Sequence, residues 1–193
     1  MKDKILMTGL LFVLMAALPL GFITNNSRSS GKKPSDTENS TLASNRNAII
    51  SKAAAYCENG FCDEAMRAIA VIARTNGKAA DSQSSQDDNN SDTELYKRLE
   101  KFYLEDNSLL CSKGKPVEIP VCKCTGGFTS ASQELEYLSS VASPWDCFST
   151  NRGISGDFQG VSAYGINYLC ENGMSAEDAL KWYLPKLGLQ TAR

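Results

Sequence analysis

A glycine-containing stretch near the end of the 193-residue chain combines backbone freedom with hydroxyl side chains. The segment GDFQGVSAYGINYLCENG, residues 156–173, carries Gly160 and Gly165, with Ser162 and Tyr164 beside them. Glycine lets a backbone approach another group closely, so this pattern is typical of a loop that surrounds a ligand and then enters a helix. The chain contains no histidine, however, and so lacks the commonest proton-transfer group at neutral pH.

Cysteine is the other reactive residue type. An odd number of cysteines leaves at least one thiol unpaired within a monomer. CENGFC spaces two of them for a short disulfide loop, whereas a zinc site would lack both histidine and a pair of CxxC motifs. Disulfides or buried thiols are therefore favoured over a metal, and we expect no cofactor. The seven cysteines are Cys57, Cys62, Cys111, Cys122, Cys124, Cys147 and Cys170.

The net charge of −2 implies no strongly basic surface, so we expect no nucleic-acid partner. Two lysines, Lys2 and Lys4, precede an uncharged apolar run over residues 5–23. Such a run is long enough to cross a bilayer, and its basic N-terminal flank favours an uncleaved signal anchor over residues 1–24. A cleaved signal peptide is the alternative. Either reading places the remaining chain outside the cytoplasm, and the anchor predicts a single-pass protein of the cell membrane.

Composition divides the rest of the chain. Residues 25–47 are polar and rich in turn-forming residues, which predicts a flexible linker. A folded domain is expected over 48–187, interrupted by a polar and disordered insertion over 77–92. The last residues, 188–193, are expected to form a tail.

Within this domain the patterns predict an α+β fold, with helices packed around a small antiparallel hairpin or sheet. Helical spacing of apolar residues predicts helices over 62–77 and 92–104, the second capped by Thr93. Short apolar runs on both sides of Lys113-Gly114 predict the hairpin. Ser162 and Ser175 are expected to cap two C-terminal helices.

Three blocks of the sequence, in order, resemble one bacterial cell-wall family. The first is EAMRAIAVIART, residues 64–75, and the second runs from GKPVEIPVCKCTGGFTS to YLSSVASPWD, residues 114–146. The third is the stretch over 156–173. Together these blocks resemble the stage II sporulation protein D/amidase-enhancer family and cover most of residues 49–187.

This resemblance implies a domain that acts on peptidoglycan outside the cytoplasm. Active members are lytic transglycosylases, in which a glutamic acid protonates the glycosidic oxygen. The E-M-P segment that carries this glutamate is absent here, and Glu58 is the nearest substitute. Asp157 occupies the position of the family's loop histidine, and Cys122 and Phe128 occupy positions where other histidines are usual. Only ten residues, 147–156, replace a longer β-rich stretch.

The residues that shape the loops are retained better than those that move protons. We therefore expect a catalytically degenerate protein that binds peptidoglycan glycan strands or a cell-wall hydrolase during sporulation or envelope remodelling. One alternative is an active transglycosylase that uses Glu58, and another is a structural envelope protein without a ligand. The residues expected in the binding loops are Arg74, Gly126, Gly127, Thr129, Asp157, Gly160, Ser162, Tyr164 and Gly165.

Overall fold

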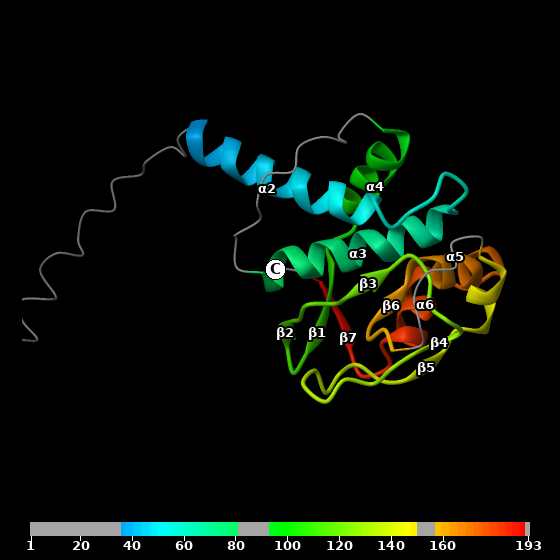
Figure 1. Ribbon diagram of the computed structural model, residues 1–193. Helices are drawn as coiled ribbons and strands as arrows, with labels where there is room; N and C mark the ends of the chain where they lie inside the picture. The colour runs from blue at the N-terminus through cyan, green and yellow to red at the C-terminus, as the bar shows by residue number, and fades with distance from the viewer. Residues whose placement is uncertain (1–35, 81–92, 150–156, 192–193) are drawn as a thin grey trace, which may run out of the picture. The chain divides into compact units, whose positions relative to one another are not determined.

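A computed structural model describes residues 36–80, 93–149 and 157–191 and has an α+β architecture, as the sequence predicts (Figure 1). Residues Thr41–Arg193 form a compact unit that holds the core and the site. Its elements follow the order α2 (Asp36–Ala54), α3 (Asp63–Ala79), α4 (Glu94–Glu105), β1 (Ser108–Ser112), β2 (Lys115–Pro116), β3 (Val121–Cys122), β4 (Phe128–Thr129), β5 (Val141–Ala142), the 3-10 helix η1 (Pro144–Phe148), β6 (Val161–Ser162), α5 (Ala163–Glu171), α6 (Ala176–Tyr183) and β7 (Gly188–Thr191).

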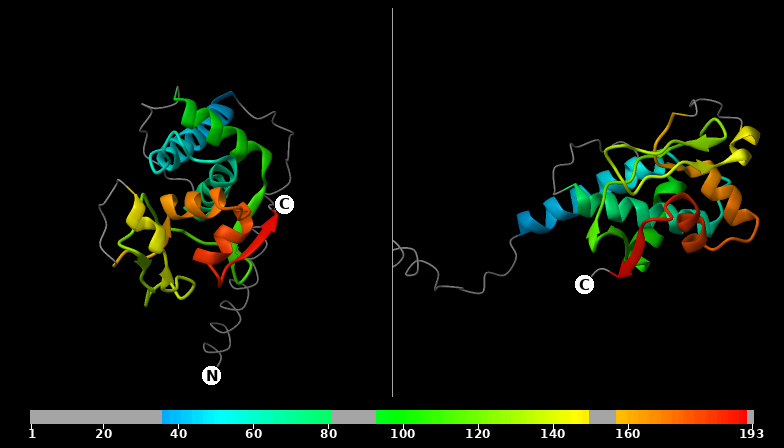
Figure 2. Two further views of the ribbon diagram at one scale, coloured as in Figure 1. Left: turned by 90° about the vertical axis from the view of Figure 1, so that its right-hand side faces the viewer. Right: turned by 90° about the horizontal axis from the view of Figure 1, so that it is seen from below.

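Helix α3 is the centre of the core and packs against α4, α5, α6 and β1 (Figure 2). Its alanines and branched aliphatic residues are buried on most sides, which lets these elements approach closely. The predicted helix is confirmed, but it continues to Ala79. The Asn76 side chain pairs with the backbone of Ile119 through two hydrogen bonds of 2.7 and 2.9 Å instead of ending the helix. The insertion was expected to begin at Gly77, but α3 continues to Ala79, so that expected boundary is too early.

The expected linker over 25–47 is also partly wrong, because α2 is helical from Asp36. Its last two turns bury Ile50 and Ala54, which lie four residues apart on one face. Asn47 accepts a hydrogen bond of 3.1 Å from the hydroxyl of Tyr96 on α4. Packing against the core thus extends a helix into a stretch whose composition is polar.

Strand β1 is the middle strand of a sheet with the order β2-β1-β7. The hairpin between β1 and β2 is confirmed, and Lys113 and Gly114 both have positive φ, as a tight hairpin turn requires. The expected tail over 188–193 is wrong for its first four residues, because Gly188–Thr191 forms β7, which pairs antiparallel with Ser108–Cys111. Residues 192–193 lie outside the described residues. Pairing with β7 satisfies the backbone of β1 along its second edge.

Two short strand pairs lie outside this sheet. Strands β3 and β6 are parallel, with Val121 opposite Val161, and β4 pairs antiparallel with β5. The parallel pair brings residues 121–122 beside residues 161–162, although about 40 residues separate them in the chain. This pairing places the Gly126-Gly127 turn next to the glycine-containing loop.

No helix within 36–80, 93–149 and 157–191 is long and apolar enough to cross a membrane. The expected anchor over 1–24, with its apolar run at 5–23, lies outside the described residues, and so do residues 81–92 of the expected insertion.

Candidate functional site

Gly160 brings the third sequence block against the second. Its φ is +129°, and a Cβ at this position would overlap the carbonyl oxygen of Pro120. The next residue, Val161, donates its N–H to that same oxygen at 3.0 Å, and the N–H of Tyr164 donates to the Lys123 carbonyl at 2.9 Å. Only glycine satisfies both the positive φ and the close approach.

The buried carboxylate of Asp146 joins three segments of the chain. It accepts hydrogen bonds from the N–H of Thr125 at 2.7 Å, from the Thr125 hydroxyl and from the Ser162 hydroxyl at 2.9 Å. Ser162 also accepts the N–H of Gly165 at 3.0 Å and so caps α5. We call this arrangement the Asp146 clasp. Because each donor is a group of the fold itself, the carboxylate is satisfied without a ligand.

A second hydrogen-bonded group lies under Gly165. The hydroxyl of Tyr183 contacts Ser143 Oγ at 2.5 Å and accepts the Trp145 indole N–H at 3.0 Å. A Cβ on Gly165 would overlap the Tyr183 hydroxyl oxygen and lie 2.7 Å from Trp145 Nε1. Helix α5 can therefore pack here only with glycine at this position.

The Gly126-Gly127 turn lies beside the clasp. Gly127 has a φ of +110°, and its carbonyl accepts the N–H of Ser143 at 2.8 Å. Thr129 is fully buried, and its hydroxyl bonds the backbone of Ser139 and Val141 at 3.3 and 3.1 Å. These residues hold the β4–β5 pair together, so their role here is structural.

The predicted catalytic candidate, Glu58, also lies at this site. Its loop joins α2 to α3 and is held to α5 by the Cys62 N–H, which donates to Asn167 Oδ1 at 2.9 Å. Burial raises the pKa of the Tyr164 hydroxyl, and the charges of Glu171, Asp146 and Glu58 raise that pKa further. The structure therefore brings the half-buried Glu58 into the electrostatic environment of Tyr164.

Two predicted residues take no part in this group. Arg74 faces the α4–β1 connection, where Nη1 donates to Asn107 Oδ1 at 3.0 Å and the guanidinium lies 4.5 Å from the Tyr103 ring centroid. Asp157 is exposed, at the edge of the described residues. Arg74 was expected near the loops because the order of the blocks along the chain does not say which face of α3 its side chain occupies.

A thiol occupies one position where the family usually has histidine. Burial raises the pKa of Cys122 to about 12, with further contributions from Asp146 and Cys124, and its Sγ lies 3.6 Å from the Val161 carbonyl. A thiol in this environment stays protonated at neutral pH and is a poor nucleophile. In the part of the chain that the structure describes, no three Cys, Asp or Glu side chains are grouped to hold a metal ion.

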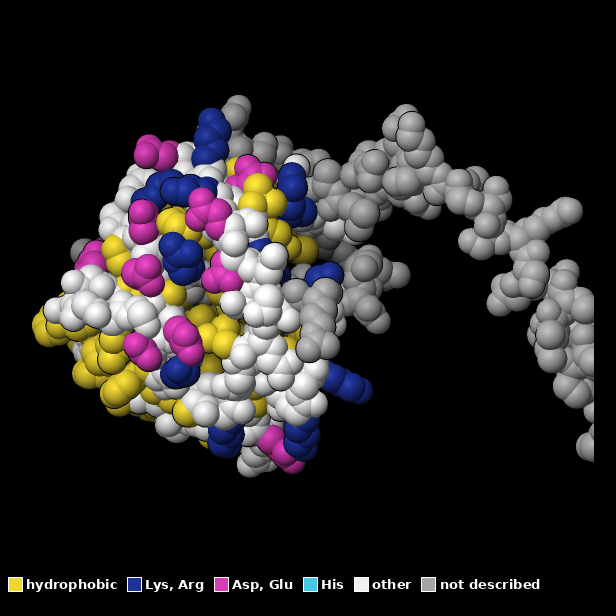
Figure 3. All heavy atoms as spheres, turned by 180° about the vertical axis from the view of Figure 1, so that it is seen from behind, with side chains coloured by type: hydrophobic (Ala, Val, Ile, Leu, Met, Phe, Trp, Pro, Cys, Tyr) yellow, Lys and Arg dark blue, Asp and Glu magenta, His cyan; other side chains and the backbone are white. Residues whose placement is uncertain are grey.

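Four aromatic rings form a row beside the clasp, which we call the aromatic row. Tyr168 on α5 stacks with both Trp145 and Phe148 of η1, with centroid distances of 5.6 and 6.4 Å, and the ring of Trp182 of α6 lies 5.7 Å from that of Trp145. Phe148 is 73% exposed and Trp182 is 41% exposed. Hydrophobic side chains also gather at the edge of the molecule that carries α5 and η1 (Figure 3).

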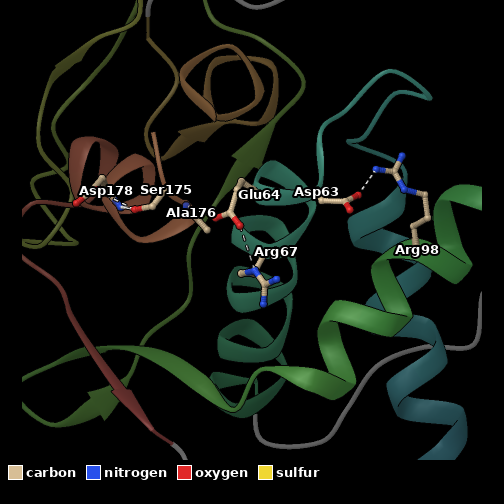
Figure 4. A network of polar contacts seen from close by, with 7 residues as sticks. All are labelled: Asp63, Glu64, Arg67, Arg98, Ser175, Ala176 and Asp178. Carbon is tan, nitrogen blue, oxygen red and sulfur yellow. Dashed lines mark hydrogen bonds and ion pairs between the residues drawn. The ribbon is translucent and has the colours of Figure 1, made fainter. Parts of the chain in front are cut away.

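Two polar contacts fix the first turn of α3 (Figure 4). Glu64 accepts the N–H of Ala176 at 2.8 Å and so adds a negative charge at the N-terminus of α6. Asp63 pairs with Arg98 of α4 at 2.7 Å. Arg98 also lines a pocket of about 480 Å³ that contains none of the predicted site residues.

No family model matches the chain, and no curated protein matches it significantly. The resemblance to the stage II sporulation protein D/amidase-enhancer family therefore rests on the three sequence blocks alone. Sequence reasoning found Gly160, Ser162 and Gly165 but missed the Asp146 clasp and the role of Tyr183. The signal for Asp146 was its place at the end of the second block, YLSSVASPWD, which had not been used to assign it a role.

Proposed function

We propose that the chain is a divergent member of the stage II sporulation protein D/amidase-enhancer family that binds peptidoglycan glycan strands without cleaving them. The Asp146 clasp supports this proposal, because it joins Thr125 of the second sequence block to Ser162 of the third and so builds one surface from both blocks. Both hydroxyls are used within the fold, and neither is left to transfer a proton to a glycosidic oxygen. By the same proposal, the protein is anchored in the cell membrane with this domain outside the cytoplasm.

The aromatic row supports glycan as the ligand. The face of an aromatic ring carries partial negative charge, and the C–H bonds of a sugar ring carry partial positive charge, so the two stack favourably. Tyr168 is half-buried and stacks with two neighbouring rings, whereas Phe148 is 73% exposed and can offer its ring to a ligand. A row of rings suits a chain of sugars better than a single small molecule.

An active lytic transglycosylase is the second candidate, and the position of Glu58 favours it. Glu58 is a half-buried carboxylate in a loop held against α5, and its charge acts on Tyr164. A carboxylic acid at such a place is the group that glycosidic cleavage needs. In that case catalysis would depend on Glu58 alone among the predicted residues.

One experiment separates these possibilities. The purified full chain is incubated with glycan strands stripped of their stem peptides, the insoluble fraction is pelleted, and released sugars are analysed by mass spectrometry. We expect the protein to pellet with the strands and no anhydro-sugar fragments to appear. Fragments that disappear in Glu58→Gln would establish the enzyme instead. If the protein does not pellet with the strands and no fragments appear, glycan binding is overturned. The search for a partner then turns to a cell-wall hydrolase.

A further inference from the structure

The side chains of Cys62 and Cys170 meet where α3 and α5 pack together. Cys62 is the N-cap of α3, and its N–H is bound to Asn167 at 2.9 Å. Cys170 follows Asn167 by three residues on α5, so both lie on the helix face turned toward Cys62. The contact with Asn167 therefore brings the Cys62 thiol near Cys170, close enough to raise the pKa of the Cys170 thiol.

Hydrogen bonds near Cys62 and near Cys170 fix the segments that carry the two residues. Glu64, two residues after Cys62, accepts the N–H of Ala176, which lies six residues after Cys170 (Figure 4). The turn after Cys170 is closed by the N–H of Gly173, which donates to the Cys170 carbonyl at 3.0 Å. The thiols are therefore brought together by the packing of two helices and not by a free loop.

The two thiols differ in access to solvent. Cys62 is half-buried, and Cys170 is 7% exposed. Burial raises the pKa of Cys170 to about 12, and the charges of Cys62 and Glu64 raise it further. A dissolved oxidant therefore reaches Cys62 first, and Cys170 reacts second from within the fold.

We propose that Cys62 and Cys170 form a reversible disulfide when the protein meets a disulfide oxidant such as glutathione disulfide. The Cys62 thiolate attacks one sulfur of the oxidant, which forms a mixed disulfide and releases one glutathione thiolate. Cys170 then gives its proton to solvent and attacks the Cys62 sulfur, which releases the second glutathione. Two protein thiols are oxidised and one glutathione disulfide is reduced to two thiols.

Cys57 is the rival partner that the CENGFC spacing suggests. Its thiol is buried at the end of α2, where Sγ lies 3.7 Å from the Ala53 carbonyl, and burial raises its pKa to about 12. A Cys57–Cys62 disulfide would have to pull Cys57 away from this contact and Cys62 away from Cys170. A Cys62–Cys170 disulfide therefore fits the packing of the helices better than a Cys57–Cys62 disulfide.

The disulfide would tie the loop that carries Glu58 to α5 and close a loop of roughly 100 residues. Closing a loop of that length restricts the unfolded chain, and we expect the melting temperature to rise by about 10 °C. The same bond would fix the position of the Glu58 loop relative to Tyr164.

The test uses the purified full chain in mixtures of reduced and oxidised glutathione, followed by alkylation in denaturant, trypsin and mass spectrometry. Trypsin leaves Cys57 and Cys62 together on peptide 53–67, and Cys170 lies on peptide 153–181. We expect these peptides to be cross-linked in the wild type and in Cys57→Ser, and separate in Cys62→Ser. The melting temperature should rise on oxidation in the same two proteins only.

The opposite pattern overturns the proposal. If the cross-link survives in Cys62→Ser or disappears in Cys57→Ser, the pair is wrongly assigned. If Cys62 and Cys170 are both alkylated after exposure to the most oxidising mixture, no such disulfide forms.

Discussion

Ser162 donates a hydrogen bond to Asp146 at 2.9 Å and accepts the N–H of Gly165 at 3.0 Å through the same hydroxyl. Ser162 is fully buried, so neither partner can exchange this bond for water. One side chain therefore satisfies a buried carboxylate and starts α5. This double role makes Ser162 the most informative position of the Asp146 clasp.

Ser162→Ala should lower the free energy of unfolding by about 2–3 kcal/mol. The loss combines a helix cap, worth about 1 kcal/mol, with a donor to a buried carboxylate, worth about 1–2 kcal/mol. Urea unfolding at pH 7 measures it. Ser175→Ala is the matched control, because Ser175 caps α6 through Asp178 N at 3.1 Å but is exposed, and we expect a loss of about 1 kcal/mol. Equal losses in the two variants would contradict the role assigned to the clasp.

Gly165→Ala should destabilise the protein by at least about 3 kcal/mol, although alanine favours helices, because its Cβ would overlap the Tyr183 hydroxyl. Gly60→Ala is the control, since a Cβ at that position has no heavy atom within 4 Å, and its stability should stay nearly unchanged. Chemical denaturation compares the two. Tyr183→Phe should lower the free energy of unfolding less in the Gly165→Ala variant than in the wild type. Additive losses would show that the hydroxyl is not the obstacle.

Stability should fall as the pH rises above about 9 under reducing conditions. Burial raises the pKa of Cys57, Cys122 and Cys170 from the ordinary 9.0 to about 12. Between these values the unfolded chain releases protons that the folded chain retains, so stability is complete below pH 9 and is lost toward pH 12. Each buried thiol lowers the free energy of unfolding by up to about 1.4 kcal/mol for each pH unit in this range.

Urea unfolding between pH 7 and pH 10.5, with a reductant present, tests this dependence. In Cys57→Ala, which removes one of these buried thiols, stability should decline less steeply with pH than in the wild type. A wild-type stability that does not change over this range would show that these thiols are not buried in the folded protein.

Phe148→Ala should weaken pelleting with glycan strands about tenfold if the proposed function holds, because it removes the exposed end of the aromatic row. Its side chain is largely exposed, so the melting temperature should change little. Leu104→Ala is the matched control: Leu104 is 56% exposed on α4, away from the row, and binding should be unchanged. Equal binding by both variants would rule out the row as the glycan surface.

Local features of the fold were predictable from the sequence. Thr93 caps α4, where its hydroxyl accepts the Tyr96 N–H at 3.2 Å, and Ser162 and Ser175 cap α5 and α6 as expected. The Lys113-Gly114 turn forms the expected hairpin. Each of these depends on residues a few positions apart, so the pattern contains the whole interaction.

The candidate site was predictable only in part. Gly160 and Gly165 stand out by residue type, and the structure shows which atoms exclude a side chain at each position. Asp146 did not stand out, because its three hydrogen bonds come from residues 16 or 21 positions away. Arg74 was assigned to the loops but contacts Asn107 instead.

The sequence by itself therefore determined helices α3 to α6, the caps of α4, α5 and α6, the hairpin and the glycine positions. Tertiary structure decided that β7 pairs with β1, that β3 lies parallel to β6 and that Cys62 lies beside Cys170. Such partners lie tens of residues apart, and many pairings of similar periodicity are possible for any one segment. The choice among them is made by how the helices and strands bury their apolar faces together around α3, which no single stretch of sequence encodes.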